Sequence, residues 1–113
     1  MRIIKMENET DLNEMSTIRT RYSGLDYEVW VDNAGNGRNV QHNLPRLKVN
    51  VDGDKIPVSI SDSPDVLAKN KKKDNIPNFR GLVKWIKLNK SLLLKFWSRQ
   101  IEFDDLLNGL KKI

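Results

Sequence analysis

Five side chains along this chain are of the types that could act on an RNA phosphodiester. A metal-free ribonuclease of the small toxin kind needs cations that hold the phosphate and a Tyr or His that exchanges protons. The candidates here are Tyr22, Tyr27, His42, Arg46 and Lys48. Because such enzymes draw their residues from scattered positions, they leave no local motif. RNA cleavage is therefore one hypothesis that the residue types leave open.

Other chemistries have less support in the sequence. His42 is the only histidine and the chain contains no cysteine, which argues against a transition-metal centre and excludes thiol catalysis and disulfides. We predict no metal site and no cofactor. Asp52 and Asp54 flank a turn, and Asp104 and Asp105 start a helix, so structural roles account for both acid pairs. The Gly-rich segment 35–38 lacks the spacing of a phosphate-binding loop.

The strongest signal in the sequence is its charge distribution. Residues 69–99 hold ten Lys or Arg residues and a single acid, Asp74. Residues 1–56 carry eight basic and nine acidic side chains, whereas residues 57–113 carry twelve and six. The formal net charge of +5 favours an anionic partner, either a nucleic acid or an acidic protein.

The elements that position these residues can be predicted from patterning. The 113 residues have room for one domain with a modest core. We expect residues 1–15 to form a loosely held N-terminal leader and residues 16–113 to form a single α+β domain. Strand patterns over 17–22 and 27–31 and turn residues 23–26 predict a first hairpin. An Asn- and Gly-rich loop should follow over residues 33–45.

A second hairpin follows that loop. Leu47, Val49 and Val51 alternate with polar residues, and Asp52-Gly53 is a strong turn signal before a return strand over residues 56–60. Pro57 has no amide hydrogen, so the return strand should lie at the edge of the sheet. The fold class expected is α+β, with an antiparallel sheet of about four strands in two hairpins.

Three helices should follow the sheet. Ser63-Pro64 predicts a short helix to about Lys69. A long amphipathic helix should span residues 78–99, with Asn78 near its cap. A short C-terminal helix should begin near Asp104 and end near Lys111 and Lys112.

The long helix should have two different faces. One broad arc is apolar, with Trp85 and Leu92 at its edge. The arc itself consists of Phe79, Leu82, Val83, Ile86, Leu93, Phe96 and Trp97. The opposite side carries Arg80, Lys84, Lys87 and Lys95. Asn89 falls in the apolar arc, so it is either a buried amide with hydrogen-bond partners or the point where the helix breaks. We expect the first, a single helix.

From Tyr22 onward, over about three quarters of the chain, the sequence resembles a family of small bacterial proteins known as domain-of-unknown-function family 4160. Tyr22-Ser-Gly24 and Tyr27–Asn33 resemble the Tyr-rich opening hairpin of that family. The stretch 58–67 and the closing-helix pattern Val83–Ile86, Asn89, Leu92, Leu93 and Trp97 are also similar. Pro45–Val49 stands where the family has a His-x-His motif, and both histidines are replaced, by Arg46 and Lys48.

The resemblance implies a binding or regulatory role, because genes of that family often lie in toxin–antitoxin-like or mobile-element settings. The replacement of both histidines argues against a metal or acid–base role at that position and makes anion binding there easier. Arg46 and Lys48 should point to the same face of their strand.

We therefore expect a small cytoplasmic binding module that engages an acidic protein or a nucleic acid, and not a membrane. The predicted surface consists of Arg46, Lys48, Lys71, Lys72, Lys73, Arg80, Lys84 and Lys87. The alternatives are the metal-independent ribonuclease and a phage-encoded inhibitor of a host defence complex. A solvated helix face without a partner would also account for the basic helix.

Overall fold

The computed structural model describes residues 16–32 and 44–113. The predicted leader, His42 and most of the Asn- and Gly-rich loop lie outside the described residues.

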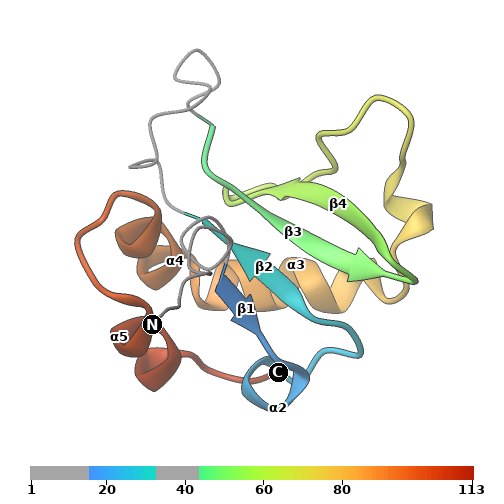
Figure 1. Ribbon diagram of the computed structural model, residues 1–113. Helices are drawn as coiled ribbons and strands as arrows, with labels where there is room; N and C mark the ends of the chain where they lie inside the picture. The colour runs from blue at the N-terminus through green and yellow to red at the C-terminus, as the bar shows by residue number, and fades with distance from the viewer. Residues whose placement is uncertain (1–15, 33–43) are drawn as a thin grey trace, which may run out of the picture.

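Four antiparallel strands form one sheet, in the order β1-β2-β3-β4 (Figure 1). The strands are β1 (Ser16–Ile18), β2 (Val29–Val31), β3 (Arg46–Val51) and β4 (Asp54–Ser59). Because each strand pairs with the next one along the chain, the sheet is a simple meander. The α+β class with a four-stranded antiparallel sheet followed by helices is confirmed.

The first pair of strands is shorter than predicted. Ile18 pairs with Val29 as expected for antiparallel neighbours, but residues 20–23 are not extended. They form a single helical turn, α2 (Thr20–Ser23), which ends at Gly24 with a φ of 82°. The buried Ser23 hydroxyl accepts a hydrogen bond from the Leu25 amide at 3.0 Å, which holds the chain in this bend. The strand prediction for residues 20–22 was therefore wrong, because local hydrogen bonds prevail over strand composition there.

The second hairpin agrees closely with its prediction. Asp52 and Gly53 have φ values of 51° and 90°, the positive pair that a tight two-residue turn between twisted strands requires. Pro57 lies on β4, the last strand of the sheet, opposite Lys48 on β3. The edge position predicted from Pro57 is confirmed.

The short helix predicted over residues 63–69 is absent. Residues 65–67 instead run along the outer edge of β4, where Ser59 N donates to Asp65 O and Leu67 N donates to Pro57 O, both at 2.9 Å. Hydrogen bonding to an otherwise unpaired sheet edge thus prevails over the local Ser-Pro helix signal. The only helical turn in the connector comes later, as the 3₁₀ turn η3 (Lys73–Asn75).

The helices follow on one side and at one end of the sheet. Helix α3 (Phe79–Leu88) runs behind the sheet, and α4 (Lys90–Trp97) and α5 (Phe103–Gly109) lie beyond its end (Figure 1). The Asn78 side chain caps α3 by accepting from Gly81 N at 3.2 Å, as its position predicted. The inward sheet residues and α3 share one core, which includes Leu47, Val49, Leu82, Trp85 and Ile86.

The long helix is broken in two at Asn89, contrary to the expectation of a single helix. Asn89 is 3% exposed, and its side chain is fully used. Its Nδ2 donates to Trp85 O and to Lys111 O, both at 3.0 Å, and its Oδ1 accepts from Lys111 N at 2.9 Å. Asn89 is therefore both a satisfied buried amide and the boundary between α3 and α4.

Helix α5 confirms the predicted C-terminal helix. Asp104 and Asp105 occupy its first turn, and Asp105 accepts from the Glu102 amide at 3.0 Å. The chain then continues as an extended C-terminal tail, residues 110–113. Besides the bonds from Asn89 to Lys111, Ile113 N donates to Ser23 O at 3.1 Å, which joins the tail to α2. Lys111 and Lys112 lie in this tail, beyond the last turn of α5.

Candidate anion-binding surfaces

The basic residues predicted to form one surface lie on two sides of the molecule. On β3, Leu47 and Val49 point into the core and are 1% and 0% exposed, so Arg46 and Lys48 share the outer face, as predicted. On α3, Leu82 and Ile86 face the sheet, so Arg80, Lys84 and Lys87 lie on the opposite, exposed side. Helix α3 lies behind the sheet (Figure 1). Because α3 covers the inner face of the sheet, its own exposed side and the outer face of β3 are on opposite sides of the molecule.

We call Arg80, Lys84 and Lys87 the helix stripe. These residues are spaced four and three positions apart on one helix, so like charges are direct neighbours, which destabilises an isolated helix. No acid occurs between residues 75 and 101 to offset them. None of the three has an ion pair with any other residue of the described part of the chain.

Asp62 interacts electrostatically with Lys87, the last residue of the helix stripe. Its carboxylate binds Lys90 Nζ at 2.6 Å, and this hydrogen bond and charge hold its pKa below the usual range. Lys87 contributes a smaller effect in the same direction. The contact links the connector after β4 to the start of α4.

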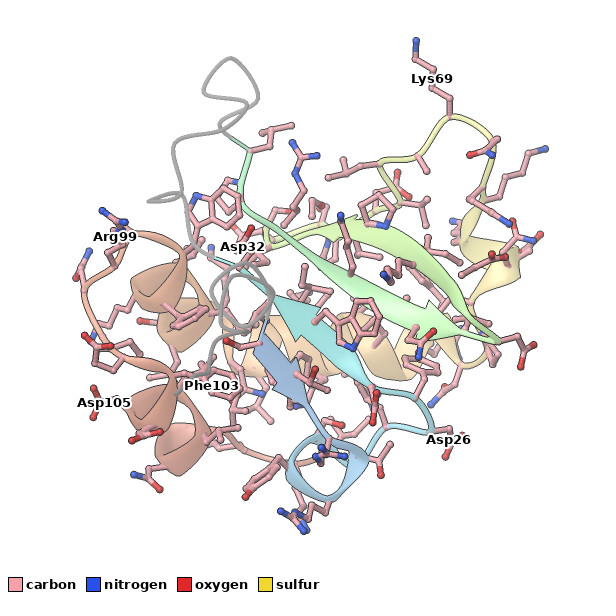
Figure 2. The ribbon with its side chains drawn as sticks, in the orientation of Figure 1. Asp26, Asp32, Lys69, Arg99, Phe103 and Asp105 are labelled. Carbon is pink, nitrogen blue, oxygen red and sulfur yellow. The ribbon has the colours of Figure 1, made fainter. Side chains whose placement is uncertain are left out.

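The connector lysines have different surroundings. Lys71 is engaged, because its Nζ lies 3.0 Å from Asp54 Oδ2 at the β3–β4 turn. Lys72 and Lys73 are exposed, just before the start of α3. Lys69 projects away from the rest of the molecule (Figure 2). The connector therefore adds Lys72 and Lys73 to the N-terminal end of α3.

We call the outer side of the sheet the sheet face. One row of residues crosses all four strands in register: Thr17, Trp30, Lys48 and Pro57. Lys55 Nζ lies 4.4 Å from the centre of the Trp30 ring. No helix in the described part of the chain packs on this side (Figure 1).

Trp30 and Lys55 were not among the predicted site residues, although the sequence contains the signal. Val29 and Val31 must face the core, so alternation alone turns Trp30 outward. Leu47 and Val49 turn Lys48 to that same face. A search for an aromatic residue among outward strand positions would have found Trp30.

The sheet face also carries acids. Glu28 lies 3.8 Å from Arg19, and Asp32 follows β2 directly. Asp32 and Arg46 already take part in polar interactions. Lys48 and Lys55, by contrast, have no acidic partner among the described residues. These two lysines are therefore the cations of the sheet face that remain available to an external anion.

The described residues among those suggested for RNA cleavage are not gathered at one place. Tyr27 points into the core, and its hydroxyl donates to Pro77 O at 2.9 Å. Burial, with a smaller effect of Asp26, raises the pKa of Tyr27 to about 12. Tyr22 is half-buried against the core beneath Arg21, whereas Arg46 and Lys48 are on the outer side of the sheet. Among the described residues, a constellation for acid–base catalysis is not formed.

The raised pKa predicts a stability change in alkali. The folded state holds the Tyr27 proton more tightly than the unfolded state, whose pKa is near 10.0. This contribution to stability is complete below pH 10 and is lost as the pH rises through about 12. Tyr27→Phe should therefore show a smaller fall in the free energy of unfolding over this window, measured by urea titration at each pH. Tyr22→Phe should retain the larger fall of the unaltered protein, and equal falls in all three proteins would contradict the prediction.

An open hollow of about 300 Å³ lies near the β3–β4 turn. Its lining includes the carboxylates of Asp26, Glu28 and Asp52, so it does not suit an anion. Within residues 16–32 and 44–113, no group of three or more His, Cys, Asp or Glu side chains is placed to hold a metal ion. No helix in the same ranges is long and apolar enough to cross a membrane.

Comparisons with family models, with curated proteins and with solved structures gave no match for this chain. The helix stripe and the sheet face are therefore the features of this chain that bear on its function.

Proposed function

We propose that this protein is a small cytoplasmic binding module that engages an anionic partner through the helix stripe. The observation that carries the proposal is the placement of Arg80, Lys84 and Lys87 as exposed neighbours on α3, without an acid beside them in sequence. Lys72 and Lys73 extend the same charge beyond the start of the helix. Regulation within a toxin–antitoxin-like or mobile-element setting is the role that the family resemblance suggests.

The energetics of the helix stripe support this role. Three cations held at helical spacing repel one another in the free protein. A partner that brings phosphates or carboxylates to the stripe removes this repulsion and releases counterions, so binding should weaken steeply as salt increases. A face that is merely solvated would gain as much solubility from alternating acids and bases, without the repulsion.

Charge reversal on the stripe tests the proposal. Lys84→Glu with Lys87→Glu should weaken binding to labelled RNA or to polyglutamate by about tenfold or more at low salt, because favourable contacts become repulsive. Fluorescence anisotropy over a salt series would measure both the affinity and its salt dependence. The matched control is Lys111→Glu with Lys112→Glu, which makes the same change in net charge on exposed residues outside α3.

Equal effects of the two double variants would mean that only net charge matters, and unchanged binding to every anion would refute the proposal. Pull-down from host lysate before and after nuclease treatment would then separate the partner classes. Retention of a host protein after nuclease treatment would favour an acidic protein, including a component of a host defence complex. Loss of the captured material would favour a nucleic acid.

A further inference from the structure

We propose that the sheet face is a second site, separate from the helix stripe, which binds single-stranded nucleic acid by stacking an unpaired base on Trp30. The inference goes beyond the proposed function, because the two surfaces lie on opposite sides of the molecule. It rests on Trp30, Lys48 and Lys55.

Trp30 is placed as a platform rather than as a core residue. The core is filled from the other side of β2 by Val29 and Val31, which are 0% and 2% exposed. Trp30 lies between Thr17 and Lys48 in the row that crosses the sheet, near the middle of the outer face. Trp30 itself is half-buried, and its Nε1 is buried without a hydrogen-bond partner. The ring therefore packs against the outer side of the sheet, and the part of it that Lys55 contacts is the part available to a ligand.

The contact with Lys55 shows that a polar group can reach the face of the ring. Its ammonium lies 4.4 Å from the ring centre, and Lys55 itself is exposed. A cation–π contact at an exposed site is weaker than the stacking of a base on an aromatic ring. A base can therefore replace the ammonium above Trp30, and the displaced Lys55 can then pair with a neighbouring phosphate.

The geometry favours single strands over duplexes. The row from Thr17 to Pro57 spans three strand spacings, about 14 Å, on a four-stranded antiparallel sheet. Such a surface accepts two or three splayed bases in other sheet-based readers of RNA. A duplex offers the ring no unpaired base, because its bases are already stacked on each other. An acidic protein would use Lys48 and Lys55 but would gain nothing from the ring.

Substitution of the ring tests the inference directly. Trp30→Leu keeps an apolar side chain but removes the stacking surface, and it should weaken binding of a single-stranded oligonucleotide about tenfold. Trp30→Phe keeps a ring and should remain within about threefold of the unaltered protein. Binding of a duplex of the same sequence should be unchanged by either variant. The probes are labelled oligoribonucleotides of about eight bases, within the usual range of site sizes.

Lys48→Glu with Lys55→Glu is the electrostatic counterpart. It should weaken single-strand binding and reduce the salt dependence of that binding, because two phosphate contacts are lost. In a protein that also carries Lys84→Glu and Lys87→Glu, Trp30→Leu should still bind the single-stranded oligonucleotide more weakly than Trp30→Phe. If no anion binds at either surface, both proposals fail. If anions bind through the helix stripe but Trp30→Leu has no effect, only the present inference fails.

A measurement on the unaltered protein guards against misfolded variants. Photo-crosslinking of an oligonucleotide that carries 5-bromouridine should attach it to Trp30 or to its neighbours on the sheet face, as located by mass spectrometry. Attachment on α3 instead would overturn the inference. So would sedimentation showing a dimer that Trp30→Leu dissociates, because the sheet face would then be occupied by a second copy of the chain.

Discussion

Replacing Asn89 with alanine should lower the free energy of unfolding by about 3 kcal/mol. The variant loses three hydrogen bonds, two donated to Trp85 O and Lys111 O and one accepted from Lys111 N. The amide and the carbonyl of Lys111 are both left without their partner, which adds to the loss. A domain of this size has a total stability of about 5–15 kcal/mol, so the change is a large share of it.

Urea denaturation followed by circular dichroism would measure this change. The melting temperature should fall by more than about 10 °C. Asn108→Ala is the matched control, since Asn108 is an exposed residue of α5, and it should change stability by less than about 0.5 kcal/mol. A small effect at Asn89 would show that the C-terminal tail contributes little to the fold.

Gly24→Ala should destabilise the protein by about 2 kcal/mol or more. Gly24 has a φ of 82°, and a Cβ atom built on it would lie 2.8 Å from the backbone oxygen of Ile113. The substitution therefore adds conformational strain to a collision with the tail, which can be relieved only if the tail moves away from α2. The hydrogen bond from Ile113 N to Ser23 O at 3.1 Å would be disturbed by the same movement.

Gly53→Ala separates the backbone strain from the collision with the C-terminal tail. Gly53 has a φ of 90°, close to that of Gly24, but a Cβ atom there would have no neighbour within 4 Å. The loss of stability at Gly53 measures backbone strain alone, and it should be about 1 kcal/mol. The excess at Gly24, obtained from the same urea titrations, measures the contact with the tail. Equal losses of stability for Gly24→Ala and Gly53→Ala would show that the tail can move away from α2 without cost.

Elements whose hydrogen bonds are local could be predicted from the sequence. The hairpin of β3 and β4 follows from alternation, Asp52-Gly53 and Pro57, all within fourteen residues. Residues 63–69 could not be predicted in this way, because their conformation depends on the vacant edge of β4. Asn89 posed the same problem, since its partner Lys111 is 22 positions away. Sequence patterning predicted either a buried, hydrogen-bonded amide or a break in the helix, and in the structure Asn89 is both.

The candidate surfaces were predictable residue by residue but not as an assembly. Alternation correctly predicted that Arg46 and Lys48 share a face, and the helical arc correctly separated Leu82 and Ile86 from Lys84. What patterning could not give is the placement of α3 on the inner side of the sheet, because that depends on how two apolar faces pack. This placement separates the sheet face from the helix stripe.

The order of the sheet has a consequence for how the chain folds. Each strand pairs with its neighbour in sequence, so no strand must wait for a distant segment before it can join the sheet. The two-residue loop between β3 and β4 closes with little loss of chain entropy, which favours assembly outward from the β3–β4 turn. The hydrogen bond from Ile113 to Ser23, which joins opposite ends of the described chain, would then form late, together with the bonds between Asn89 and Lys111 in the same tail. Interactions absent from the folding transition state act mainly on the unfolding rate, so the tail would set how long the native state persists rather than how quickly it forms.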